Sequence, residues 1–117
     1  MPSPAEITLH QKSKLLEIAF DDGARYRFPY EFLRVHSPSA EVRGHGPGQE
    51  ALQTGKKDVA LLNVQPSGSY AIKLTFDDGH DSGLYTWEYL HGLGEHQDTL
   101  WQDYLRRLAD AGASREP

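Results

Sequence analysis

The sequence contains no cysteine, which rules out a disulfide, a thiolate zinc site, a cysteine-ligated iron–sulfur cluster and a cysteine nucleophile. Its longest apolar runs are too short to cross a membrane. Positive charge is scarce: the chain has 12 Lys and Arg but 17 Asp and Glu, which gives a net charge of −5. This balance argues against a nucleic-acid-binding module, which would carry a basic patch. The N-terminus also lacks the charged-then-apolar pattern of a secretory signal. We therefore expect a cytoplasmic protein with neither a nucleic-acid nor a membrane partner.

The length and composition predict one folded domain. A chain of 117 residues can bury a single core. Its hydrophobic content of 38% and charged content of 25% are somewhat polar, but they do not indicate disorder. We expect one domain over residues 1–112 and a disordered tail over residues 113–117.

An internal repeat organises the chain. Residues 16–23 (LEIAFDDG) match residues 72–79 (IKLTFDDG), and residues 30–33 (YEFL) match residues 87–90 (WEYL). The residues before each Asp-Asp-Gly alternate between apolar and other side chains, which predicts a half-buried strand. The aspartates can bond to the backbone ahead of them, and glycine accepts a positive φ, so Asp-Asp-Gly predicts a turn. Each half should therefore contain a strand, a turn, a second strand and a short helix, with Phe20 and Phe76 in equivalent environments.

The remaining elements follow from periodicity and from helix-breaking residues. Pro29 suits the first position of a helix over residues 30–35, and the helix that begins at residue 87 should end near Gly92 or Gly94. Residues 58–64 are predicted as a strand. Its first part, residues 58–62, is nearly continuous in apolar side chains, which predicts a central strand covered on both faces. Residues 36–57 predict a long loop with a helical turn at residues 49–53. Residues 95–111 predict an amphipathic helix that ends at Gly112; its apolar stripe is Leu100, Trp101, Tyr104, Leu105 and Leu108. The predicted class is α+β and β-rich, with two pseudo-repeated hairpin-plus-short-helix units and a C-terminal amphipathic helix.

Histidines are the candidate metal ligands. The sequence has no His-x-x-x-His or His-Glu-x-x-His pair, so it carries no local signature of a zinc hydrolase. His36, His45 and His80 are all predicted in loops or at turn edges. They could converge with Glu41 or Asp81 to bind zinc or iron. The alternative is that each packs in a loop or lies on the surface.

Serines with nearby histidines are the candidate nucleophiles. Ser37, Ser39 and Ser82 lie close in sequence to histidines, but no Gly-x-Ser-x-Gly motif surrounds them. The glycine-rich residues 44–48 lack the Lys-Ser/Thr end of a phosphate-binding loop. The sequence therefore favours a protein that is not an enzyme.

Two longer motifs resemble a known family. Residues 33–42 (LRVHSPSAEV) and residues 70–85 (YAIKLTFDDGHDSGLY) look like those of the DUF971 family, which is similar to the N-terminal domain of gamma-butyrobetaine hydroxylase. The resemblance covers about residues 7–94. It implies a β-rich α+β domain without the catalytic double-stranded helix that holds iron and 2-oxoglutarate in the full hydroxylases.

The same resemblance implies where a structural zinc would be bound. Three cysteines and one histidine hold zinc in the related domain, and their positions fall here on Ser37, Ser39, Val42 and His80. A serine hydroxyl is a poor zinc ligand and valine is none, so only His80 remains a ligand. Domains of this family also occur attached to iron–sulfur carrier ATPases, which implies an accessory or docking role with a protein partner.

Our first interpretation is a non-catalytic accessory or interaction domain. The alternative is a metal-binding protein that holds zinc or iron through His80 with His36 or His45 and acts in iron or iron–sulfur handling. The first repeat has Ala24 where the second has His80, so turn geometry alone does not require a histidine there. We favour a hydrogen bond from His80 to the loop over residues 36–57 as the reason for it.

Overall fold

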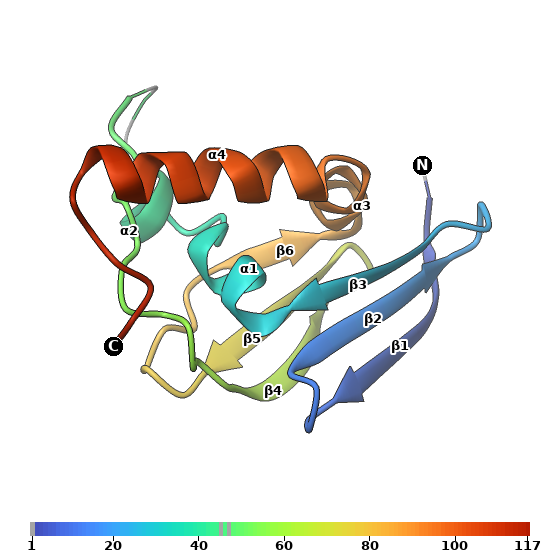
Figure 1. Ribbon diagram of the computed structural model, residues 1–117. Coiled ribbons are helices and arrows are strands. Elements are labelled where there is room, and N and C mark those ends of the chain that lie inside the picture. Colours follow the sequence, from blue (N-terminus) through green and yellow to red (C-terminus); the bar gives the residue numbers. More distant parts are fainter. Residues whose placement is uncertain (1, 45, 47) are drawn as a thin grey trace.

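The computed structural model describes residues 2–44, 46 and 48–117, and its strands form two three-stranded antiparallel sheets (Figure 1). The elements are β1 (Pro4–His10), β2 (Leu15–Phe20), β3 (Arg25–Pro29), α1 (Tyr30–Val35), α2 (Ala40–Arg43), β4 (Leu61–Ser67), β5 (Ala71–Phe76), β6 (Leu84–Thr86), α3 (Trp87–Glu95) and α4 (Gln97–Asp110). The first sheet has the order β1-β2-β3 and the second β4-β5-β6. The helices α1, α3 and α4 lie over one side of the sheets, with α4 outermost (Figure 1). This arrangement confirms the predicted α+β class.

The two halves of the chain repeat one unit of three strands and a helix. The first unit is β1, β2, β3 and α1, and the second is β4, β5, β6 and α3. Both outer strands carry an irregularity at the same place, between Pro4 and Glu6 in β1 and between Leu61 and Asn63 in β4. The repeat is therefore one strand longer in the structure than the sequence match indicated.

The two Asp-Asp-Gly turns are equivalent, as predicted. The amide of Gly23 donates to the carbonyl of Phe20 at 3.1 Å, and the amide of Gly79 donates to the carbonyl of Phe76 at 3.2 Å. Both glycines have a φ of +89°, which a residue with a side chain rarely adopts. Phe20 and Phe76 are both buried in the core, at 3% and 1% exposure.

The first aspartate of each turn holds the start of the outer strand. The Asp21 carboxylate accepts a hydrogen bond from the amide of Ser3, and the Asp77 carboxylate accepts one from the amide of Ala60, each at 3.0 Å. In return, each aspartate donates its own amide to the carbonyl of the same partner. The main role of Asp21 and Asp77 is therefore to form the turn and to anchor the start of the outer strand.

The second aspartate of each turn contacts the helix of the other unit. Asp22 Oδ2 lies 2.8 Å from His91 Nε2 on α3, and Arg34 Nε on α1 donates to Asp78 Oδ2 at 2.7 Å. Arg34 and His91 occupy the same position in the two matched helices. Each helix is thus fixed to the turn of the opposite unit, and the two units are joined by a reciprocal pair of polar contacts.

The Arg34–Asp78 contact is the more buried of the two. The side chain of Arg34 is only 8% exposed, and Lys56 Nζ also lies 2.6 Å from Asp78 Oδ2. Burial acts to raise the pKa of Asp78, but hydrogen bonds from Lys56, the His80 amide and Arg34 outweigh it and lower that pKa to about 2. Within the described residues, Arg34 Nη1 is buried without a hydrogen-bond partner.

Most of the core lies between the sheets and the helices. Its largest fully buried side chains are Tyr30, Tyr85, Phe28, Phe32, Phe76, Leu16, Ile18, Leu33, Leu61, Ile72, Leu74 and Leu90. Val35, Tyr104 and Leu108 form a second cluster beneath α4. Trp101 packs against both groups, so it connects α4 to the main core.

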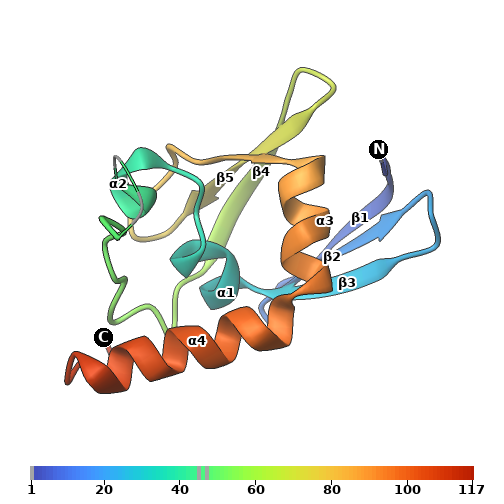
Figure 2. The same cartoon turned by 90° about the horizontal axis from the view of Figure 1, so that it is seen from above.

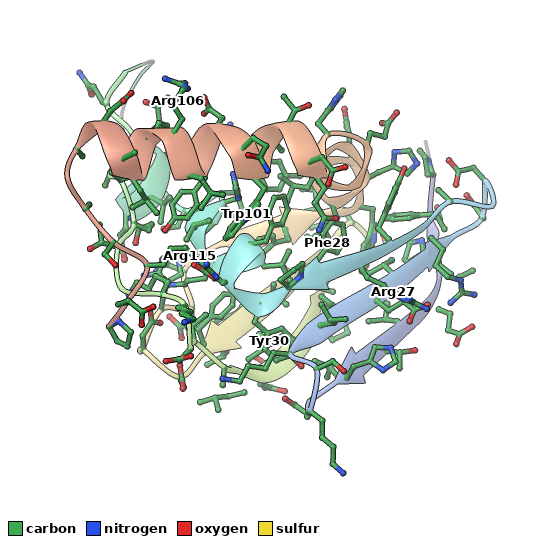
Figure 3. The ribbon with its side chains drawn as sticks, viewed as in Figure 1. Arg27, Phe28, Tyr30, Trp101, Arg106 and Arg115 are labelled. Carbon is green, nitrogen blue, oxygen red and sulfur yellow. The ribbon has the colours of Figure 1, made fainter. Side chains whose placement is uncertain are left out.

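The C-terminal tail is placed against α1, whereas we expected it to be disordered. Arg115 donates two hydrogen bonds to the Glu31 carboxylate, at 2.8 and 2.7 Å, and its guanidinium lies 5.3 Å from the centre of the Trp101 ring (Figure 3). The amides of Gly55 and Lys57 donate to backbone carbonyls of the tail. The composition of residues 113–117 gave no sign of these distant partners.

The prediction of a central strand over residues 58–64 was wrong. β4 spans Leu61–Ser67, pairs only with β5 and forms one edge of its sheet. Leu62 is 64% exposed as a result. Pro66 lies inside β4, and proline is tolerated there because an edge strand has amides without a ladder partner.

Three further local predictions need correction. The short helix of the long loop is α2, capped by the Ser39 hydroxyl, rather than a turn at residues 49–53. Pro29 ends β3 and precedes α1, so it is not the first helical residue. Helix α3 continues past Gly92 and Gly94 to Glu95. A Cβ on Gly94 would overlap the Tyr26 ring, so this glycine permits close packing and does not end the helix.

Across the part of the chain that the structure describes, none of the helices combines the length and apolar character needed to cross a membrane.

The reciprocal contacts predict unequal effects of two matched substitutions. Asp78→Asn should lower the free energy of unfolding by about 3 kcal/mol, because it leaves the Arg34 guanidinium buried without its charged partner. Asp22→Asn should have a clearly smaller effect, because its contact with His91 is exposed. Equal losses in urea unfolding would contradict this ranking.

The Arg34–Asp78 contact should also make the stability of the protein depend on pH in acid. Because the pKa of Asp78 is lower in the folded state than its ordinary 3.8, its contribution to stability is present above 3.8 and lost as the pH falls toward about 2. The Asp78→Asn variant should therefore lose less stability than the original chain over that interval.

Trp101→Ala should lower the free energy of unfolding by about 2 kcal/mol, less than for a fully buried tryptophan, because Trp101 is partly exposed. Denaturant unfolding followed by circular dichroism would measure the loss. A loss well under 1 kcal/mol would show that α4 contributes little to the core.

Candidate functional site

The positions where the family resemblance placed zinc ligands come together in the structure. Ser37 and Ser39 lie in the connection between α1 and α2, and His80 lies in the loop between β5 and β6. The side chains of all three are buried, with Ser37 only 1% exposed. Two segments that are distant in the sequence therefore meet at one cluster of polar side chains, which we call the serine–histidine cluster: Ser37, Ser39, Glu41, His80 and Ser82.

Hydrogen bonds connect the whole serine–histidine cluster. His80 Nε2 lies 2.9 Å from Ser37 Oγ, and His80 Nδ1 lies 3.4 Å from Glu41 Oε2. A carboxylate can only accept, so Nδ1 carries the proton and the Ser37 hydroxyl donates to Nε2. Ser82 donates to Glu41 Oε1 at 3.2 Å, so its oxygen accepts the proton of Ser39 at 2.8 Å.

The histidine of this cluster is neutral at pH 7. Burial and the positive charge of Arg34 lower the pKa of His80, although Glu41 and Asp78 act in the opposite direction. The predicted hydrogen bond from His80 to the segment over residues 36–57 is confirmed, with the side chain of Ser37 as the partner. The imidazole thus ties this segment to the Asp-Asp-Gly turn of the second unit.

The cluster contains the residue types of a serine hydrolase triad, but its nucleophile is covered. The order Ser37–His80–Glu41 matches that of a serine, a histidine and a carboxylate. However, Ser37 is almost completely buried, and a Cβ added to Gly83 would overlap its hydroxyl. A substrate carbonyl would need to reach that oxygen from the space that Gly83 and Pro38 fill. The geometry therefore supports a structural role for these residues.

Zinc does not fit this arrangement. Two ligands of one tetrahedral zinc, each about 2.0 Å from the metal, would lie roughly 3.3 Å apart. Ser37 Oγ and His80 Nε2 are closer than that and share a proton instead. Val42, at the remaining ligand position, is a buried apolar side chain. A hydrogen bond between a hydroxyl and an imidazole lies where the resemblance implied a zinc site.

The other predicted metal ligands lie apart from this cluster or outside the described residues. His36 Nδ1 lies 2.9 Å from the carbonyl of Phe32, and Asp81 pairs with Lys73. His45 is outside the described residues. Among the described residues, no group of three or more histidines, aspartates and glutamates is placed to hold a metal ion. A metal site formed by His36, His45 and His80 stays a prediction.

Sequence reasoning missed a second feature, a hollow among the helices. His36, Tyr89 and Leu100 line it together with Arg43 and Arg107. Arg107 follows Leu100 and Tyr104 by seven and three residues, which places it on the apolar stripe of α4. That position is a signal in the sequence that could have identified Arg107.

Comparison with known proteins gives a consistent result. The family described as gamma-butyrobetaine hydroxylase-like, N-terminal, matches residues 7–91. Two protein structures determined by NMR in solution are 56% and 50% identical to this chain, each with a TM-score of 0.86. Both alignments cover 100% of this chain, and they cover 92% and 87% of the respective relatives.

A third structure is more distant. It is a crystal structure of a DUF971-family protein of unknown function from Acidithiobacillus ferrooxidans, with 38% identity and a TM-score of 0.67. The alignment covers 79% of this chain and 92% of that one. No protein of curated function matches the sequence.

A glycine substitution tests whether the serine–histidine cluster holds the α1–α2 connection. Gly83→Ala should push Ser37 away from His80, destabilise the protein and speed amide exchange over residues 37–44. Gly92→Ala is the matched control: a Cβ there meets no atom, so this change within a helix should stabilise by about 0.5–1 kcal/mol. Unchanged exchange in Gly83→Ala would show that the cluster does not hold this connection.

Proposed function

This chain belongs to the gamma-butyrobetaine hydroxylase-like N-terminal family, and on that premise we propose that it acts as a non-catalytic interaction domain for a protein partner. The observation that carries the proposal is the closed serine–histidine cluster. Ser37 and His80, the serine and histidine of the triad-like order, are buried and bonded to each other, so they stabilise a connection and the Ser37 hydroxyl is not open to a substrate.

Two further observations support an interaction role. The two NMR relatives are matched over almost their whole length, so little beyond this domain is present in either of them. The surface also presents large apolar side chains, namely Ile7, Leu9, Leu62, Tyr70 and Leu84. Exposed apolar groups and surface hollows are features through which small domains bind other proteins.

A cytoplasmic location is part of the proposal. Small secreted domains commonly depend on disulfides, and this chain has no cysteine with which to form one. The buried Arg34–Asp78 contact and the main apolar core join the two units without a disulfide.

The proposal is tested by capture followed by reconstitution. The chain, purified through a tag without histidines, should retain a specific protein from cells that make both, and the two purified proteins should form one complex of fixed stoichiometry. Metal analysis of the same preparation should find no stoichiometric zinc or iron.

The decisive contrary result concerns metal. Stoichiometric zinc or iron that disappears in His80→Ala, with the fold retained, would overturn the proposal in favour of a metal-binding function. The His91→Ala variant is the control, because His91 occupies a separate exposed contact with Asp22 and Glu95.

A further inference from the structure

Two adjoining hollows lie among α1, α3, α4 and residues 50–53. The larger, of about 530 Å³, is lined by Leu93, Leu100 and Tyr89 among others, and the smaller, of about 280 Å³, is lined by Arg43 and Arg107. His36, Tyr89 and Leu100 line both, so the two hollows adjoin at these three residues, and we call the pair the cleft. Figure 2 shows the helices that surround it, with α3 and α4 running in different directions around the end of α1.

The arginines of this cleft differ from the others in the chain. Arg25, Arg27, Arg34, Arg106 and Arg115 each pair with a carboxylate. Among the described residues, neither Arg43 nor Arg107 forms such a pair, although the protein carries a net charge of −5. Two guanidinium groups without a charged partner therefore line the same hollow.

The neighbouring polar groups are already oriented by the fold. Tyr89 donates its hydroxyl proton to the carbonyl of His36 at 2.5 Å, and the Arg43 guanidinium lies 5.5 Å from the centre of the Tyr89 ring. A carbonyl only accepts, so His36 Nδ1 donates to Phe32 and its Nε2 is the acceptor of the neutral ring. Burial lowers the pKa of His36, as does the charge of Arg107, so the ring is neutral at pH 7.

We infer that this cleft binds the free C-terminal carboxylate of the protein partner, with the apolar side chain of the partner's last residue in the larger hollow. The inference rests on the proposed function and adds the chemistry of the bound segment. Guanidinium groups bind carboxylates through paired, charge-assisted hydrogen bonds. The acceptor Nε2 of His36 suits the amide of the last residue, and Leu93 and Leu100 suit its side chain.

The shape of the cleft favours a chain end over a small organic acid. Small-molecule sites usually enclose most of their ligand, whereas the larger hollow is widely open to solvent and extends beyond the arginines. Glu50 and Glu88 also line the two hollows, so they disfavour acidic side chains in the bound segment outside its terminal carboxylate.

The direct test uses peptides that differ only at the terminus. Fluorescently labelled hexapeptides that end in Leu, Phe or Val, each as the free acid and as the amide, are titrated against the intact chain. At least one free acid should bind tenfold or more tightly than its amide. Arg107→Gln and Arg43→Gln should each weaken that binding at least tenfold, with unfolding curves unchanged because both side chains reach solvent.

Arg27→Gln is the matched control. It removes the same charge from β3, which contributes no residue to either hollow, and should leave peptide binding unchanged. Equal binding of acids and amides, equal loss in Arg27→Gln, or no binding by any peptide would overturn the inference. Binding of 3-phenylpropionate as tight as that of the best peptide would overturn it in favour of a small organic acid.

The experiments can distinguish a wrong carboxylate site from a wrong interaction role. If a partner is captured equally by the original chain and by a double Arg43→Gln, Arg107→Gln variant, the interaction role stands and the carboxylate site is wrong. If the partner loses binding when its last residue is removed, both hold.

Discussion

The structure depends on the buried contact between Arg34 and Asp78. It joins the helix of the first unit to the turn of the second, and the exposed contact between His91 and Asp22 makes the same connection in the other direction. Each helix also contacts a strand of its own unit, so the polar contacts add a connection between the units. Side chains from both units form one main core, and the two contacts help to fix the units relative to each other.

The two units are equivalent in backbone but not in chemistry. The turn of the first unit continues into Ala24, and that of the second into His80, which extends the contacts of the second turn to the α1–α2 connection. In the serine–histidine cluster, hydroxyl and imidazole groups bond directly where the family resemblance implies thiolates around zinc. These bonds hold the α1–α2 connection against the second Asp-Asp-Gly turn. Among the described residues, Arg43 and Arg107 differ from the other arginines because neither pairs with a carboxylate, and both line one hollow among the helices.

Local signals in the sequence predicted those parts of the fold that depend on neighbouring residues. The alternation before each Asp-Asp-Gly, the glycines at positive φ and the apolar stripe of α4 all produced the expected strands, turns and helix. The prediction failed where an apolar run fits both a central strand and an edge strand. Residues 58–64 looked like a covered central strand, but their exposure was set by which strands pair with β4, and only β5 does. The composition of the tail indicated disorder, and its partners in the structure, Glu31 and the amides of Gly55 and Lys57, lie far from it in the sequence.

The sequence by itself determined the repeat, the α+β class and the turn chemistry, because each of these follows from residue types at short spacing. The zinc-ligand positions, of which only His80 keeps a ligand side chain, came from the family resemblance. Only the tertiary structure decided that each helix contacts the turn of the other unit and that Ser37 meets His80 across 43 positions. It also decided that Arg43 and Arg107 line one hollow, where neither pairs with a carboxylate among the described residues. The physical reason is that hydrogen bonds and ion pairs act over a few ångströms in space. Their partners are set by the packing of distant segments, which the local pattern of a sequence does not contain.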